Sequence, residues 1–492
     1  MRPPSFGSFF LKALAAIAVG VVLRFVVGLT PVWWLVWLAP APLLALAFRN
    51  RPGDARWMVA LAAVIATSTN FAYLRLVGPV AFAALAVVGQ AALWVFVVMA
   101  TRQVVVAYKA WWTVFAYPVF WVAADTLMAA LLPDGNWASL AYSQADVLPL
   151  LQLTSLFGVP GLLFLVALVP SALALGLAFG RDLRHGWRAY AVTLALLVAA
   201  TAFGGARLQT PVAGTAASIG IVSIDDAIGL EASKPYAAKI LNAYEQRVTA
   251  LASRGAEIVV LPEKIALLPS ASAEAWRQRF SALARANKVW LEVGVGSDEG
   301  GRQVNLAWLF DPDGNLTDQY QKHFLAPPER GRFVPGTDFS LRSIGGAKYA
   351  LAVCKDMHFA SLGRAYGARG ASVVLVPAWD FNYVDAWMES RTTVTRGVEN
   401  GYTVVRASRE GLLTVSDPYG RVLAETPSRP LPGADLLVRA TISAPVPTLY
   451  TKIGDAVGLI CVLLAAALMV VARQRRPAPA TGRLGPQSVS PA

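Results

Sequence analysis

The chain has 492 residues, of which 56% are hydrophobic and only 15% charged, and its mean hydropathy is +0.51. A water-soluble protein of this length would carry about a quarter charged residues, so the composition excludes a purely soluble protein and indicates a protein of the lipid bilayer. The formal net charge of +13 does not indicate nucleic-acid binding, because the basic residues gather at the ends of apolar segments.

Eight apolar segments are candidates for membrane-spanning helices, since about 20 residues are needed to cross the hydrocarbon core. They are residues 9–29, 32–48, 57–77, 80–100, 111–132, 150–179, 189–206 and 453–472. The second is short and contains Pro40 and Pro42. We expect the first to be a retained helix, because it lacks a convincing cleavage site and other spans follow it directly.

The loops between these segments alternate between basic and neutral or acidic. The basic loops and ends contain Arg2, Lys12, Arg49, Arg51, Arg56, Arg102, Lys109, Arg181, Arg184, Arg188, Arg473, Arg475, Arg476 and Arg483. The loop 133–149 has no lysine or arginine and carries Asp134 and Asp146. Because basic loops stay in the cytoplasm, both termini are predicted to be cytoplasmic and the segment 211–450 extracytoplasmic.

Between residues 211 and 450 the pattern changes to short β-branched runs alternating with amphipathic stretches. The predicted strands are 218–224, 258–261, 290–295, 304–310, 316–320, 349–353, 373–376, 403–407 and 412–416, and the predicted helices are 236–254 and 273–287. The sequence Asp-Pro-Asp-Gly-Asn at 311–315 is a hairpin signal. This alternation predicts one layered α/β domain.

Three ionisable residues, Glu263, Lys322 and Cys354, each follow an apolar predicted strand. Strand ends in layered α/β folds open onto clefts, where loops carry function. Cys354 is one of two cysteines, and the other, Cys461, lies in the last apolar segment. A thiol that faces an oxidising compartment without a disulfide partner indicates a working nucleophile.

The ordered set of motifs around these residues resembles the Glu–Lys–Cys triad of the nitrilase superfamily. The motifs are Leu261-Pro262-Glu263, Tyr320-Gln321-Lys322, Pro327-Pro328-Glu329, Val353-Cys354, Pro377-Ala378-Trp379-Asp380-Phe381, Arg396-x-x-Glu399-Asn400-Gly401 and Asp417-x-x-Gly420-Arg421. The resemblance covers most of residues 215–440 and implies an αββα sandwich.

The membrane segments narrow the resemblance further. Residues 137–144, 151–161 and 451–455 are similar to the corresponding segments of bacterial apolipoprotein N-acyltransferases. The resemblance implies a multi-pass α-helical protein of the bacterial inner membrane, with about eight spans and an inserted periplasmic nitrilase-like domain. Its implied activity is transfer of an acyl chain from a phospholipid, through a cysteine thioester, to the N-terminal amine of a diacylglyceryl-cysteine apolipoprotein.

The expected division of the chain has four parts. They are a seven-helix domain at 1–210, the catalytic domain at 211–450, the eighth helix at 451–473 and a disordered cytoplasmic tail at 474–492.

The same resemblance implies roles for the site residues. Cys354 is the nucleophile, Glu263 the general base, and Lys322 stabilises the oxyanion together with the backbone N–H that follows Cys354. Glu329, which orients Lys322 or tunes Glu263, and Asp356 are expected to support this triad.

The chain departs from the family at two motifs. The family's Cys-Tyr-Glu is Cys354-Lys355-Asp356 here, and its Trp-Pro-Glu is Leu-Pro-Glu followed by Lys264. Two extra lysines near the pocket favour anionic groups such as a phosphate headgroup. Lys355, Trp379 and Trp387 are the candidate substrate-binding residues.

Several alternatives remain open at this point. Water could replace the amine, which would make the protein a membrane-anchored amidase; it could acylate a different amine, or be an inactive scaffold. The apolar segment 265–269 either dips into the bilayer to admit acyl chains or packs in the core.

His323 and His358 are too few and too poorly spaced for a metal site. We expect a monomer without cofactor, metal or nucleic acid.

Overall fold

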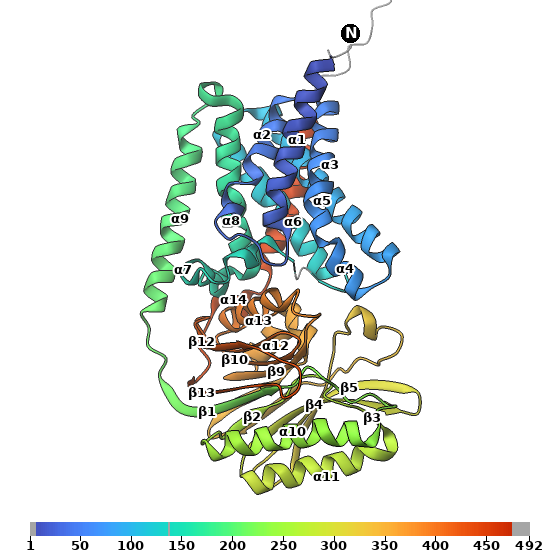
Figure 1. The fold of residues 1–492 in the computed structure, drawn as a ribbon. Coiled ribbons are helices and arrows are strands. Elements are labelled where there is room, and N and C mark those ends of the chain that lie inside the picture. Colours follow the sequence, from blue (N-terminus) through green and yellow to red (C-terminus); the bar gives the residue numbers. More distant parts are fainter. Residues whose placement is uncertain (1–5, 136–137, 475–492) are drawn as a thin grey trace, which may run out of the picture.

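The computed structural model describes residues 6–135 and 138–474 and consists of a helical bundle and a sandwich of two β-sheets (Figure 1). The bundle contains α1 (Phe6–Val27), α2 (Pro40–Arg49), α3 (Pro52–Thr67), α4 (Phe71–Val77), α5 (Val80–Tyr108), α6 (Ala116–Leu131), α7 (Leu148–Leu151), α8 (Thr154–Phe179), α9 (Trp187–Leu208), α14 (Leu449–Ile453) and α15 (Ala456–Gln474). Short 3-10 turns are η1 (Leu35–Trp37), η2 (Ser68–Asn70), η3 (Trp111–Phe115), η4 (Leu140–Gln144), η5 (Gly180–Asp182), η6 (Pro327–Glu329) and η7 (Cys354–His358).

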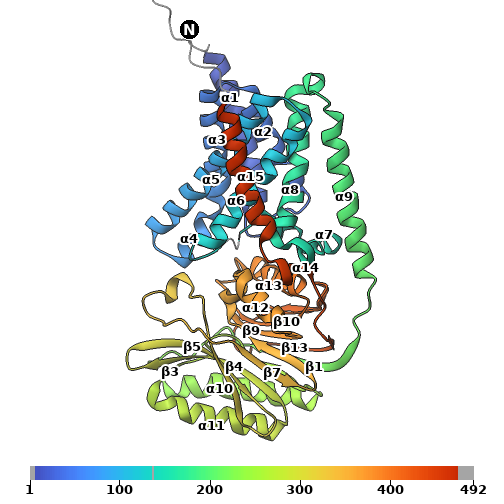
Figure 2. The same ribbon diagram turned by 180° about the vertical axis from the view of Figure 1, so that it is seen from behind.

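Within the described residues, seven helices are long and apolar enough to cross a membrane. They are Phe9–Val27, Pro52–Val77, Val80–Tyr108, Trp111–Leu131, Thr154–Asp182, Trp187–Leu208 and Ala456–Gln474, and each coincides with one of the expected spans. Figure 2 shows α15 running along the bundle beside α6.

The expected count of about eight spans is not confirmed, because the second apolar segment is too short. It folds as η1 followed by the ten-residue helix α2, which begins at Pro40. Proline has no backbone N–H and fits the first helical turn, so it starts a new helix instead of continuing one. Ten residues rise only about 15 Å, half the thickness of the hydrocarbon core.

The sandwich is built from two sheets. Its strands are β1 (Gly214–Ser223), β2 (Ile258–Val260), β3 (Leu267–Pro269), β4 (Trp290–Glu299), β5 (Arg302–Phe310), β6 (Leu316–Gln321), β7 (Ser340–Ile344), β8 (Ala347–Leu351), β9 (Val373–Trp379), β10 (Thr403–Arg409), β11 (Leu412–Ser416), β12 (Val422–Pro427) and β13 (Ala434–Ser443). One sheet has the order β13-β1-β2-β4-β5-β6, with β3 beside β4, and the other β12-β11-β10-β9-β8-β7.

Helices cover both outer faces of this sandwich. The helices α10 (Lys234–Ser253) and α11 (Ser270–Asn287) lie on the face away from the bundle, and α12 (Ala360–Ala368) and α13 (Ala386–Asn400) on the face toward it (Figure 1). Apolar residues of both sheets, such as Ile221, Leu309 and Val405, meet in the buried layer between them. The expected αββα sandwich on a multi-helix membrane part is confirmed, although β3, β7, β12, β13, α12 and α13 were not predicted.

The segment 265–269 packs in the core and does not dip toward the bilayer. Ile265, Ala266 and Leu268 are at most 2% exposed, and β3 pairs with β4 in parallel. These side chains complete the apolar layer beneath α10 and α11. The bilayer interpretation of this segment is therefore wrong.

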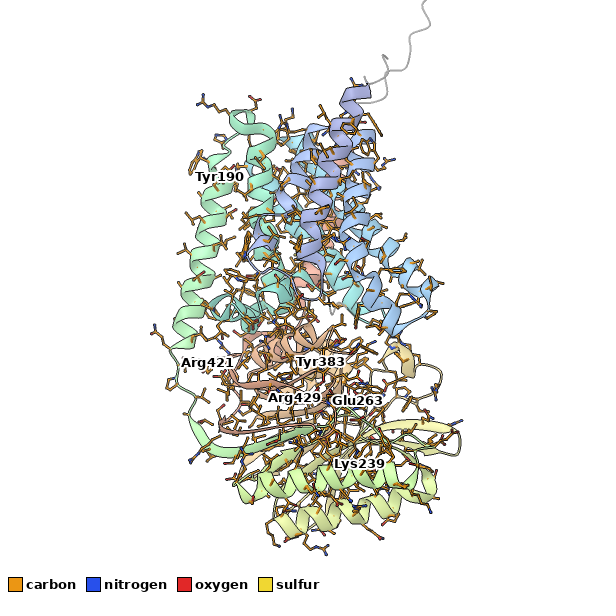
Figure 3. The ribbon with its side chains drawn as sticks, viewed as in Figure 1. Tyr190, Lys239, Glu263, Tyr383, Arg421 and Arg429 are labelled. Atoms are coloured by element: carbon orange, nitrogen blue, oxygen red, sulfur yellow. The ribbon has the colours of Figure 1, made fainter. Side chains whose placement is uncertain are left out.

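Polar contacts join the sandwich to the bundle. The side-chain amide of Gln152 donates to the carbonyl of Tyr419 at 2.8 Å, and the carboxylate of Glu399 accepts from the backbone N–H of Val159 at 3.0 Å. Arg421, labelled in Figure 3, donates to the carbonyl of Leu208 at the end of α9. The predicted domain division stays a prediction, and the expected tail beyond residue 474 lies outside the described residues.

The close packing between α8 and α14 can be tested by a substitution at Gly158. Its φ is +64°, and a Cβ atom would lie 2.3 Å from the ring of Tyr450. We expect Gly158→Ala to destabilise the detergent-solubilised protein by about 2 kcal/mol or more, measured by thermal unfolding, because strain and overlap add.

The control is Gly205→Ala on α9, where nothing lies within 4 Å of the added Cβ. Alanine favours a helix relative to glycine, so this variant should keep the wild-type midpoint or raise it slightly. Equal midpoints for the two variants would contradict the account of the junction.

Candidate active site

The three residues of the expected triad come together where strands β2, β6 and β8 end. Glu263 lies three residues beyond β2, Lys322 directly follows β6, and Cys354 lies three residues beyond β8, at the start of η7. Glu263 and Lys322 are each 1% exposed. Figure 3 places Glu263 at the side of the sandwich that approaches the bundle.

Lys322 lies between two carboxylates. Its ammonium donates to Oε1 of Glu263 and to Oε2 of Glu329, both at 2.9 Å. The ammonium of Lys264 lies 2.5 Å from Oε1 of Glu329 and 3.5 Å from Oε1 of Glu263. The side-chain amide of Asn305 donates to Oε1 of Glu263 at 2.6 Å and to Oε1 of Glu329 at 2.7 Å. Two cations therefore balance two anions in a buried cluster, as burial of charge requires.

The cluster keeps Lys322 and Glu329 charged. Burial alone would lower the pKa of Lys322, but the charges of Glu263 and Glu329 outweigh it and raise that pKa well above its ordinary value. Burial opposes ionisation of Glu329, yet Lys322 and Lys264 hold the pKa of that carboxyl well below its usual range. Lys322 is thus a fixed positive charge beside the thiol.

Cys354 has a left-handed backbone conformation, with φ of +48°. A residue other than glycine adopts this region only when its surroundings enforce it, which is common at functional sites. Its Sγ lies 3.7 Å from the carbonyl of Trp379, and the backbone N–H of Glu263 donates to the neighbouring Ala378 carbonyl at 3.3 Å. The end of β9 therefore contacts both the thiol and the expected base.

The pKa of Cys354 is raised, first by burial and then by the charge of Glu263, while Lys322 acts in the opposite direction. The thiol is therefore protonated at neutral pH until a base removes its proton. This need fits a carboxylate at the position of Glu263.

Asp356 connects η7, the turn that carries Cys354, to the segment after β6. Its carboxylate accepts from the hydroxyl of Tyr320 at 2.7 Å and from the backbone N–H groups of Val353, His323 and Phe324 at 2.9, 3.1 and 2.9 Å. Val353 precedes Cys354 in the chain and His323 follows Lys322. These bonds therefore set the position of Cys354 relative to Lys322. The supporting role expected for Asp356 and Glu329 stays a prediction, and this geometry is consistent with it.

Lys355 points to the helical bundle. Its ammonium forms an ion pair with Asp134, which follows α6, and Arg330 contacts the same carboxylate. Burial lowers the pKa of Lys355 and the charge of Asp134 raises it. The net result is a pKa below the ordinary value of a lysine. Burial opposes ionisation of Asp134, yet the hydrogen bond from Arg330 and the charge of Lys355 lower its pKa.

The two candidate tryptophans lie in different places. Trp379 is 37% exposed, lines the cavity described below, and its ring lies 4.2 Å from the guanidinium of Arg409 and 5.1 Å from the ammonium of Lys264. Trp387 is not among the residues that line this cavity; its indole donates to Asp146 at 3.0 Å and its ring packs against the bundle. The expectation that Trp379 and Trp387 bind substrate stays a prediction.

A cavity of about 680 Å³ extends from the thiol into the helical bundle. At one end it is lined by Cys354, Lys355, Glu263, Lys322 and Trp379. In the bundle it is lined by apolar side chains of α4, α5 and α6 and the residue that follows α6, namely Leu74, Val77, Phe82, Leu85, Ala86, Leu93, Trp94, Trp121, Met128 and Leu132. The site thus joins the thiol of Cys354 to a largely apolar channel among membrane helices.

Sequence reasoning missed two features of this site. Asn305 lies inside β5, where one polar residue in an apolar run carries no distinctive signal. A second polar group on the cavity wall contains His358, whose ring lies 2.5 Å from the carboxylate of Glu389, and Asp385, whose pKa burial raises to about 8. Only the fold brings these residues together.

Within residues 6–135 and 138–474, no group of three histidine, cysteine or acidic side chains is placed to hold a metal ion. That the site works without metal or cofactor stays a prediction.

A strand-end cysteine beside a buried carboxylate–ammonium cluster, on an αββα sandwich attached to membrane helices, defines a membrane-embedded protein of the nitrilase type. Residues 215–439 match the carbon-nitrogen hydrolase family, and residues 19–172 match the N-terminal domain of apolipoprotein N-acyltransferases. The chain belongs to the apolipoprotein N-acyltransferase family of the nitrilase superfamily.

Individual relatives resemble different shares of the chain. An apolipoprotein N-acyltransferase from Geobacter metallireducens is 27% identical over 398 residues, covering 73% of this chain and 74% of that protein. An omega-amidase from Mus musculus is 28% identical over 202 residues, covering 36% of this chain and 73% of that protein. The crystal structure of an amidase from Nesterenkonia sp. has 26% identity and a TM-score of 0.41, covering 50% of this chain and 95% of that one.

The electrostatics of Cys354 can be tested by alkylation with iodoacetamide in a Cys461→Ser background, which leaves one thiol. We expect Glu263→Gln to shift the pH midpoint of alkylation downward, because it removes the charge that raises the pKa of the thiol while Lys322 remains.

The matched control is Glu257→Gln, which removes the same charge at the exposed beginning of β2. It should leave the midpoint where the wild type has it. A midpoint that stays constant or rises in Glu263→Gln would contradict the described geometry.

Proposed function

We propose that the protein transfers an acyl chain from a membrane phospholipid to the free N-terminal amine of a diacylglyceryl-cysteine lipoprotein, in two steps through a thioester on Cys354. The observation that carries this proposal is the continuous cavity between the thiol and the apolar side chains of α4–α6. An acyl chain in the channel would present its ester carbonyl at the thiol end.

In the first step, Glu263 takes the proton of Cys354 and the thiolate attacks the ester carbonyl of the phospholipid. The tetrahedral oxyanion is stabilised by the ammonium of Lys322 and by the backbone N–H of Lys355. The carbon–oxygen bond breaks, Glu263 returns the proton to the leaving alkoxide, and a lysophospholipid departs. The acyl chain remains bound to sulfur.

In the second step, the lipoprotein amine attacks the thioester and Glu263 accepts its proton. The carbon–sulfur bond breaks, the thiol recovers a proton, and the product is an amide. A thioester suits this step because amines attack it more readily than an oxygen ester. The two half-reactions use one site in turn, which is a ping-pong mechanism.

Lys322 supports both steps through its position. Two carboxylates hold its ammonium, so its charge does not need to reorganise when the oxyanion forms. Glu329 would keep Lys322 in place, and Asn305 would orient both carboxylates.

We also propose that the sandwich faces the periplasm and that both termini are cytoplasmic. The basic connection between α8 and α9, with Arg181, Arg184 and Arg188, lies at the end of the bundle away from the sandwich (Figure 1). Such loops stay in the cytoplasm. The protein would act as a monomer in the bacterial inner membrane, with the catalytic domain over residues 211–450.

The amidase alternative is not favoured. The likeness to omega-amidases covers only 36% of the chain and leaves the helical bundle without a purpose. Hydrolysis of small amides does not require an apolar channel of this kind.

The test is intact-protein mass spectrometry of the full chain after exposure to dipalmitoyl phosphatidylethanolamine. We expect a palmitoyl adduct on Cys354 that is absent in Cys354→Ala. Lys322→Met should slow its formation roughly a hundredfold or more, because an oxyanion donor is lost.

The acylated protein is then mixed with a diacylglyceryl-cysteine peptide. The adduct should pass to the peptide when its α-amine is free and persist when that amine is acetylated. Loss of the adduct to water at the same rate with both peptides would support an amidase-like hydrolase and sink the proposal.

A further inference from the structure

Three charged side chains from separate parts of the chain meet beside the thiol end of the cavity, which Asp134 and Lys355 line and which Arg330 approaches through its contact with Asp134. Asp134 follows α6 of the bundle, Lys355 is the second residue of η7, and Arg330 follows η6. The ammonium of Lys355 and one guanidinium nitrogen of Arg330 both contact Oδ1 of Asp134. The other guanidinium nitrogen lies 3.3 Å from Oδ2, and Pro133 adds a carbonyl acceptor at 3.1 Å.

The charges in this group do not balance. Two cations share one carboxylate, so the group has one surplus positive charge. Lys355 is 4% exposed, and a buried ammonium requires an anionic partner. Arg330 and Lys322, which also act on it, are positive, and the buried carboxylate of Glu389, on which Lys355 acts, is already bound to His358. The carboxyl of the neighbouring Glu329 is already bound to Lys322 and Lys264.

The position of the group relative to the reaction is fixed by the chain. Lys355 follows Cys354 directly, so their Cα atoms are about 3.8 Å apart. Lys355, Asp134 and Cys354 all line the same cavity. In a glycerophospholipid, the reacting ester and the phosphate are attached to one three-carbon glycerol unit. A lipid with its ester carbonyl at Cys354 therefore brings its phosphate within reach of these cations.

We propose that Lys355 and Arg330 bind the phosphodiester of the acyl donor, at the position that the carboxylate of Asp134 occupies in the free protein. This inference rests on the proposed function and names the part of the donor that this chain recognises. Guanidinium and ammonium groups together suit a phosphate, since arginine can bind two of its oxygens and lysine acts as a point charge.

Asp134 then has a definite purpose. It keeps the buried ammonium of Lys355 and the half-buried guanidinium of Arg330 paired while no lipid is bound, and a phosphodiester replaces it as the counter-ion. Asp134 lies just beyond the end of α6, where the carboxylate can move aside without disturbing the helix.

The experiment compares two donors that differ only in the phosphate headgroup. Dipalmitoyl phosphatidylethanolamine and dipalmitoylglycerol are supplied in the same detergent to the full-length protein, and the rate of palmitoyl-Cys354 formation is followed by mass spectrometry. Lys355→Met and Arg330→Met should each raise the apparent KM for the phospholipid about tenfold, since a hydrogen bond to a charged group is lost. The KM for dipalmitoylglycerol should change less than about twofold.

Two further variants separate binding from structure. Lys355→Arg keeps the cation and should retain most of the phospholipid preference. Asp134→Asn removes the competing anion and should lower the apparent KM for the phospholipid, whereas a merely structural Asp134 would make its loss harmful with both donors. Lys348→Met, on the strand that leads to Cys354, is the matched control and should not change either KM.

Equal effects of Lys355→Met and Arg330→Met on both donors would overturn the inference. A rise in KM that the two variants show with both donors, and only when inorganic phosphate is present, would also overturn it. That result would mean that the site binds free phosphate. If neither donor labels Cys354 in the wild type, the proposed function fails and not this inference alone.

Discussion

The structure depends on one buried ammonium, that of Lys322, and on what its burial demands. An ammonium that is 1% exposed is tolerable only with complete partners, and Glu263 and Glu329 supply them at 2.9 Å each. Those carboxylates in turn need Lys264 and Asn305. The cluster therefore forces the ends of β2 and β6 and the interior of β5 into one arrangement, and the same arrangement places a fixed charge beside the thiol.

The second constraint is the contact between the sandwich and the bundle. The face that carries α12 and α13 lies toward the membrane helices (Figure 1), and Cys354, at the start of η7, lines a cavity that extends into the bundle. Lys355 extends this relation across the boundary through Asp134. A soluble relative with the same sandwich would have no need for such a contact. In this chain the contact between the sandwich and the bundle joins the thiol to a channel among apolar helices.

The sequence contains strong signals for the parts that are local and weak ones for the parts that are not. Seven spans and most strands were predicted because apolar length and period are local properties. Glu263, Lys322 and Cys354 were predicted because each follows a predicted strand within a short motif that resembles the nitrilase superfamily. The expected count of eight is not confirmed because of the second segment, where length was counted without the break that Pro40 introduces. Asn305 and the pairing of Lys355 with Asp134 depend on contacts between residues far apart in the chain, which no local pattern encodes.

The central claim is that an acyl chain reaches Cys354 through the channel lined by α4, α5 and α6. A phospholipid with a photoreactive group at the end of its acyl chain tests this directly, with cross-linked peptides mapped by mass spectrometry. The account predicts cross-links to channel residues such as Leu85, Leu93 and Met128. Cross-links confined to the outer faces of α9 or α15, in protein that still forms the Cys354 adduct, would contradict it.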